Sequence, residues 1–65
     1  MKITITDEIN EIKREIRVRE KIYPQWVLIH KISKATAEKR VNALKATLAR
    51  LERTQRSEGE QKTLL

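Results

Sequence analysis

The sequence predicts an all-α protein that folds as an antiparallel helical hairpin. Large apolar residues recur at steps of three and four in two long stretches, which is the period of an amphipathic helix. A short polar segment separates the two stretches, and the chain of 65 residues has a single proline and a single glycine. Two apolar seams joined by a short turn are typical of antiparallel helices that pack on each other.

Length and composition predict one domain that gains stability from association. Below about 70–80 residues a single core supplies only roughly 3–5 kcal/mol, and small domains usually add disulfides, metals or partners. The chain has no cysteine and one histidine, so we expect neither a disulfide framework nor a metal site or other cofactor. Self-association or a protein partner is then the expected source of further stability.

The charge is compatible with two kinds of partner. Fifteen Lys and Arg residues against nine Asp and Glu residues give a net charge of +6, which suits nucleic acid or an acidic protein surface. The longest apolar stretch, residues 22–32, contains polar residues and is far shorter than the ~18 residues of a membrane span. The start of the chain lacks a hydrophobic signal region, so we expect a cytoplasmic protein and no membrane association.

The first helix is expected at about residues 6–29. Thr4 or Thr6 can cap its start, and Asp7 and Glu8 then lie in the first turn, where negative charge suits the helix dipole. The seam of this helix consists of Ile5, Ile9, Ile12, Ile16, Tyr23, Trp26 and His30. Pro24 lacks the N–H that would bond to the carbonyl of Glu20, which predicts a kink or a break near residues 23–24.

The second helix is expected at about residues 34–56. No glycine is present in the turn, so His30 or Lys31 would take the left-handed conformation that ends the first helix. Ser33 is a good N-cap for the second helix, and Thr36 is the competing choice. The second seam consists of Ala37, Val41, Leu44, Leu48 and Leu51. Residues 1–56 form the predicted domain, and residues 57–65 are expected to be a flexible tail.

A second apolar stripe on the first helix predicts a further contact. Val18, Ile22 and Ile29 lie off the first seam, close to Trp26, and a helix that is apolar on two sides needs two neighbours. A dimer that forms a four-helix bundle would cover this stripe, and so would another protein. Tyr23 and Trp26 are either core residues or binding hot spots. The predicted interaction residues are Val18, Ile22, Tyr23, Trp26 and Ile29, with Arg17 and Lys21 at the rim.

Catalytic residues are missing from the sequence. Ser33 and Ser57 have only His30 as a base, and a catalytic triad also needs an orienting acid. Glu11 and Glu15 share a helix face, but a metal site in a bundle needs Glu-x-x-His pairs, and position 27 is valine. We therefore expect a protein that is not an enzyme.

The basic second helix gives an alternative function, the binding of nucleic acid. Its start resembles the recognition helix of a helix-turn-helix protein. The candidate contacts are Ser33, Lys34, Thr36, Arg40 and Lys45. The preceding segment argues against this interpretation, because Trp26 and Lys31 occupy places where that motif has a small residue and a glycine.

The stretch Tyr23-Pro24-Gln25-Trp26-Val27, between a charged helix and a second helix rich in alanine and arginine, resembles a motif of small proteins encoded by bacteriophages and prophages. The resemblance covers roughly residues 8–52 and departs at the turn, where His30-Lys31 stands in place of a glycine followed by lysine. It implies a phage accessory protein that acts inside the bacterial host cell by binding a host or phage protein.

Overall fold

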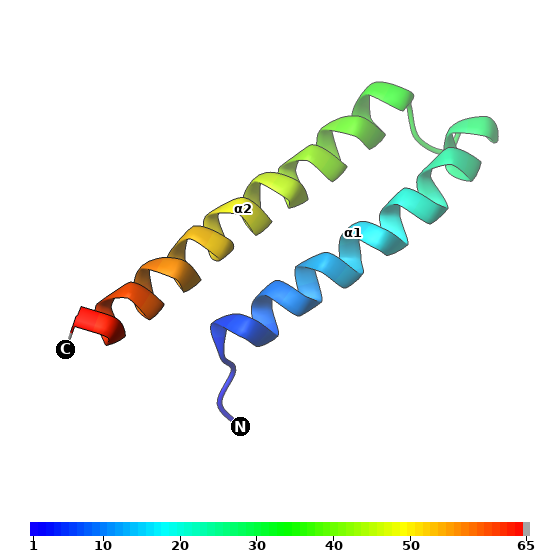
Figure 1. The fold of residues 1–65 in the computed structure, drawn as a ribbon. Helices are drawn as coiled ribbons and strands as arrows, with labels where there is room; N and C mark the ends of the chain where they lie inside the picture. Colours follow the sequence, from blue (N-terminus) through cyan, green and yellow to red (C-terminus); the bar gives the residue numbers. More distant parts are fainter. Residues whose placement is uncertain (65) are drawn as a thin grey trace.

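Two antiparallel helices make up the protein. The computed structural model describes the backbone of residues 1–64 and the side chains of residues 1–58. Helix α1 spans Ile5–Leu28 and helix α2 spans Lys34–Leu64. The helices lie side by side and are joined by a short turn at the closed end of the hairpin, while residue 1 and the end of α2 lie at the open end (Figure 1). The predicted all-α hairpin is confirmed.

Helix α1 begins with a capping box. Thr4 Oγ1 accepts a hydrogen bond from the Asp7 N–H at 3.1 Å, and Asp7 Oδ2 accepts one from the Thr4 N–H at 3.0 Å. Each residue thus satisfies a backbone donor that the helix itself leaves unpaired. The cap is Thr4, and Thr6 lies inside the helix.

The capping box makes the start of α1 sensitive to acid. The hydrogen bonds that Asp7 accepts from Thr4, with the backbone bond as the largest cause, hold the pKa of Asp7 below its ordinary value. Because the pKa is lower in the folded state, this stabilisation is complete above the ordinary pKa and is lost as the pH falls through the lowered pKa. We expect an NMR titration to show the Thr4 amide shifting together with the Asp7 carboxyl. An Asp7 carboxyl that titrates at its ordinary value would contradict the capping box.

Pro24 lies inside α1, which continues to Leu28 without interruption. The break predicted near residues 23–24 is therefore absent from the backbone. Continuing the helix keeps buried Tyr23 and half-buried Val27 on the side that faces α2, while the ring of Pro24 is exposed. The packing of these neighbours outweighs the one hydrogen bond that proline cannot donate.

A Schellman motif closes the hairpin. Ile29 is the C-cap, and His30 follows in the left-handed region with a φ of 58°. The Lys31 N–H bonds to the Trp26 carbonyl at 2.8 Å and the His30 N–H bonds to the Val27 carbonyl at 3.1 Å, which is the paired bonding of this motif. The apolar contact that usually accompanies it is replaced here, because Lys31 Nζ lies 4.4 Å from the centre of the Trp26 ring. The left-handed residue expected at position 30 or 31 is thus His30.

Replacing His30 by glycine is expected to stabilise the protein. A side chain in the left-handed region costs roughly 1–2 kcal/mol, and glycine removes this cost. The greater conformational freedom of glycine in the unfolded chain offsets part of the resulting gain in stability. We expect the free energy of unfolding in urea to rise by about 1 kcal/mol. Lys31→Gly is the matched control, because φ is not positive at Lys31, and this variant should be less stable than the parent.

Ser33 caps helix α2. Its Oγ accepts a hydrogen bond from the Thr36 N–H at 3.1 Å, and its carbonyl accepts the first helical bond, from Ala37, at 3.0 Å. The helix continues past Arg56, its predicted end, to Leu64. Only one glycine and no proline follow Arg56, and a single glycine costs a helix about 1 kcal/mol. The predicted flexible tail, residues 57–65, falls largely outside the described side chains.

The core of the hairpin is one layer of side chains between the helices. The molecule measures 54 × 25 × 14 Å, so there is no room for a third layer. Ile9, Ile16, Tyr23 and Ala37 are buried, and no described side chain is less than 2% exposed. The first three are the seam positions predicted for the first helix, whereas the seam residue His30 is exposed. So small a core gives only marginal stability.

Candidate protein-binding surface

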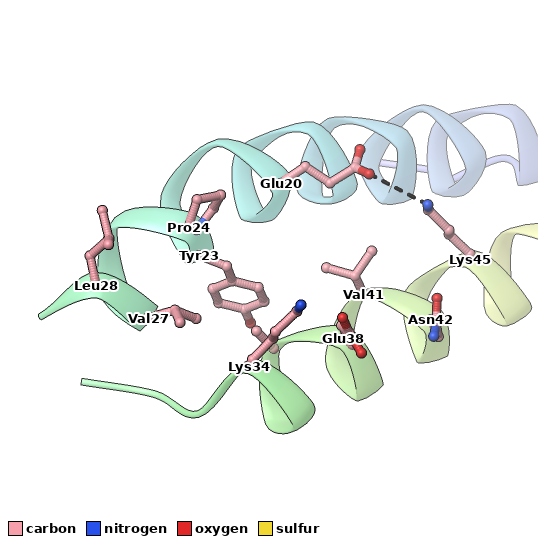
Figure 2. A pocket seen from close by; sticks show the side chains of 11 residues that line it. Glu20, Tyr23, Pro24, Val27, Leu28, Lys34, Glu38, Val41, Asn42 and Lys45 are labelled. Atoms are coloured by element: carbon pink, nitrogen blue, oxygen red, sulfur yellow. Dashed lines mark ion pairs between the residues drawn. The ribbon is translucent and has the colours of Figure 1, made fainter. Parts of the chain in front are cut away.

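An apolar groove of about 600 Å³ lies between the helices near the closed end (Figure 2). Both helices form it, and the side chains that line it belong to Glu20, Tyr23, Pro24, Val27, Leu28, Lys34, Ala37, Glu38, Val41, Asn42 and Lys45. We call this the closed-end groove. Its floor is apolar and its charged residues lie at the rim, which is the usual composition of a binding site for an apolar group.

Tyr23 forms the floor of the closed-end groove. Its side chain points from α1 toward α2, and the residue is 5% exposed (Figure 2). The Arg19 guanidinium lies 5.8 Å from the centre of the ring, and the Trp26 ring lies at the same distance, tilted by 48°. The buried Tyr23 ring therefore has a cationic and an aromatic neighbour, both on its own helix.

Charged residues line the rim of the groove. Glu20 of α1 and Lys45 of α2 form an ion pair of 3.4 Å across the hairpin (Figure 2). Both side chains are about half exposed, so the pair contributes at most about 1 kcal/mol. Lys34 also lies at the rim and forms no ion pair with a described residue.

Two large apolar side chains are exposed beside each other at the closed end. Leu28 is 79% exposed and Ile29 is 63% exposed. Successive residues of a helix point about 100° apart, so these two serve different surfaces. Leu28 lines the closed-end groove, whereas Ile29 continues the row of half-buried Val18, Ile22 and Trp26 along α1. We call Val18, Ile22, Trp26 and Ile29 the apolar row.

The structure divides the predicted interaction residues among three faces of α1. Tyr23 is buried between the helices, and the apolar row faces away from the closed-end groove. Arg17 and Lys21 are exposed and share a helical row with Pro24 and Leu28, so they flank the groove. Sequence reasoning missed the groove residues Val27 and Leu28, for which the run of apolar residues at 26–29 was the available signal. It placed Val41 in the second seam but not in a binding site.

A second, smaller groove lies on the other side of Tyr23. It has a volume of about 340 Å³ and is lined by Glu15, Arg19, Tyr23, Arg40, Ala43, Leu44 and Thr47. Arg19 and Glu15 form an ion pair of 2.6 Å along α1. This ion pair places two charged groups at the rim of the second groove, which makes that groove less suited to an apolar ligand.

The candidate nucleic-acid residues do not form one surface. The hydroxyl of Ser33 accepts the bond from the Thr36 N–H and donates to Thr36 Oγ1 at 2.8 Å, so both residues belong to the cap. Lys34 and Lys45 line the closed-end groove, and Arg40 lines the second groove. The helices also run antiparallel, whereas those of a helix-turn-helix cross at about 90–120°.

The perturbed pKa values lie outside the grooves. Besides Asp7 in the capping box, the hydrogen bonds from Arg14 lower the pKa of Glu11, and the same contact, at 2.6 Å, raises the pKa of Arg14. These groups are exposed, so the shifts reflect surface pairing. Among the described residues there is no cluster of three potential metal ligands. In the same part of the chain no helix is long and apolar enough to cross a membrane.

Fold and surface together define a two-helix hairpin with an apolar groove at its closed end. Comparison with protein families, curated proteins and solved structures finds no match to this chain.

Proposed function

We propose that this protein is a non-catalytic binding module that attaches to another protein through the closed end of its hairpin. The observation that carries this proposal is the closed-end groove, with the 79% exposed side chain of Leu28 beside it. An exposed apolar side chain next to an open apolar groove gains free energy when a partner covers both.

The shape and charge of the groove favour an apolar segment that carries acidic residues. The groove lies between two helices, as in proteins that bind an amphipathic helix. Lys34 at its rim, and Arg17 and Lys21 on its flank, form no ion pair with any described residue. Glu38 at the rim likewise forms no ion pair with a described residue, but the three cations outnumber it. The excess of positive charge favours acidic groups beside the apolar contact, which would increase the association rate and the specificity.

Self-association and a phage role are further parts of the proposal. We propose that two copies form a four-helix bundle, since only four apolar residues are buried among the described side chains. We also propose that α1 is kinked near Pro24 and that this kink shapes the groove, because Pro24 has no N–H to bond to the carbonyl of Glu20. The resemblance of Tyr23-Pro24-Gln25-Trp26-Val27 to small phage proteins supports an accessory role in the cytoplasm of a bacterial host.

Affinity capture from a bacterial lysate tests the binding function. The tagged chain and two variants are compared, each with and without nuclease. Leu28→Glu places a charge at the groove and should abolish capture of the partner. Gln25→Glu adds the same charge at an exposed position that lines neither groove, and should retain it. Capture that both variants retain equally would contradict a site at the closed-end groove.

Replacing Trp26 by alanine is expected to weaken the dimer. Trp26 is the largest side chain of the apolar row, and truncation of a hot-spot residue costs about 2 kcal/mol or more. We expect the dissociation constant from sedimentation equilibrium to rise by roughly 30-fold. Val27→Ala is the control, because Val27 is equally half-buried but lies outside the row. An unchanged dissociation constant at unchanged helicity would show that Trp26 is not in the interface.

Nucleic-acid binding remains the second candidate function. Six of the seven bases among the described side chains of α2, all except Lys45, form no ion pair with a described residue, so their charge is available to phosphates. Material that is captured only in the absence of nuclease would favour this function over the binding of a protein.

A further inference from the structure

The apolar row continues toward the start of α1 as a row of glutamates. Glu8, Glu11 and Glu15 precede Val18, Ile22, Trp26 and Ile29 at steps of three and four, so all seven lie on one side of the helix. No Lys or Arg belongs to this row. One side of α1 therefore carries carboxylates in its first half and is apolar in its second half, and Glu11 and Glu15 pair there with Arg14 and Arg19 of the same helix.

The charges of the two helices indicate which of them meets a second copy. Residues 5–28 contain five acids and five bases, whereas the described side chains of α2, residues 34–58, include seven bases and three acids. A contact between two α2 helices would bring like charges together, and a contact between two α1 helices would not. Only α1 also has a row of large apolar side chains outside the hairpin seam.

The acidic half of the row selects the direction of the contact. In a parallel pair of α1 helices each glutamate would lie next to its own copy. Glu11 and Glu15 are compensated by Arg14 and Arg19, but Glu8 forms no ion pair with a described residue, so its two copies would repel each other. In an antiparallel pair the apolar halves overlap for about 17 Å, given the 1.5 Å rise per residue. The glutamates then extend past the end of the facing helix, toward the Lys31 of the second copy.

From this we infer that the partner on the apolar row is a second copy of this chain, bound with the two α1 helices antiparallel. Ile22 of each copy lies against Trp26 of the other, and Val18 lies against Ile29. The basic α2 helices lie on the outside of the bundle and the closed-end groove stays open. The inference rests on the proposed dimer, but it does not depend on which protein fills the groove.

Disulfide trapping tests the inference in a chain that has no cysteine of its own. Val18→Cys and Ile29→Cys are made separately, with tags of different size, and are oxidised alone and as a mixture. The antiparallel pair predicts a cross-linked product in the mixture and none from either variant alone. Leu28→Cys is the control for the face, since Leu28 lines the groove and should not cross-link with Val18→Cys.

The possible results separate this inference from the proposed binding function. Products from Val18→Cys alone and Ile29→Cys alone would show a parallel pair and would overturn the direction. Equal cross-linking by Leu28→Cys would overturn the choice of face. Absence of any product, together with a monomer in sedimentation, would overturn the second copy as the partner. Capture of a partner by the groove is measured independently, with Leu28→Glu, and can succeed in each of these cases.

Discussion

Replacing Tyr23 by alanine is expected to unfold the protein. Loss of a buried large aromatic side chain costs about 3–5 kcal/mol, which is close to the whole stability of a domain of this size. Tyr23 is 5% exposed and is the only aromatic residue among the four buried residues of the part of the chain whose side chains are described. Its ring also contacts Trp26 and Arg19, so its loss would remove the packing that joins the closed ends of α1 and α2.

Circular dichroism at 222 nm with urea titration measures this effect. The Tyr23→Ala chain should show little helix at micromolar concentration and no cooperative transition. Leu28→Ala is the control, because Leu28 is 79% exposed, and its stability should lie within about 0.5 kcal/mol of the parent. A Tyr23→Ala variant that unfolds as cooperatively as the parent would show that the seam on either side of Tyr23 is sufficient to hold the hairpin.

Replacing Pro24 by alanine is expected to have the second largest effect, in the opposite direction. A proline inside a helix is about 3 kcal/mol less favourable than alanine, and Pro24 lies inside α1. Alanine restores the N–H that bonds to the carbonyl of Glu20. Because Pro24 is exposed, the core loses nothing. Proline also restricts the unfolded chain, which offsets roughly 1 kcal/mol of the gain.

The melting temperature measures the gain in stability. A net gain of about 2 kcal/mol should raise it by roughly 10 °C in a domain of this size. Gln25→Ala, at the next exposed position, should change it little. A lower melting temperature for Pro24→Ala would mean that the native helix depends on the shape that proline imposes. The same variant tests the groove, because Pro24 lines it, and we expect a more stable protein that captures less partner.

Local signals in the sequence predicted the hairpin and the starts of its two helices, but not the end of α2, which lies at Leu64 rather than near Arg56. The caps Thr4 and Ser33 each depend on one hydroxyl and on the backbone N–H three residues later. Residue type and spacing therefore narrowed each cap to two candidates, and the structure selects Thr4 over Thr6 and Ser33 over Thr36. The buried positions Ile9, Ile16 and Tyr23 recur every seven residues, and this spacing can be recognised in the sequence without the structure. The absence of glycine in the turn left His30 or Lys31 as the left-handed residue, and the structure has it at His30.

The closed-end groove could not be predicted in the same way. It depends on how far apart the two helices lie at Tyr23 and Val41, which is set by packing between distant parts of the chain. The exposure of Leu28 likewise depends on where α1 ends relative to α2. At Pro24 a local rule predicted a kink or a break, and the helix continues through the proline without a break because the residues on both sides pack against α2.

The contact between Lys31 and Trp26 gives the protein a built-in optical probe. Trp26 is the only tryptophan, and a cation covers one face of its indole only while the turn is closed. Its fluorescence therefore reports on the closed end, whereas circular dichroism averages over both helices. If the chain opens from its free ends, the dichroism falls first and the emission changes last, so two simple spectra taken during one melt reveal the order in which the hairpin comes apart.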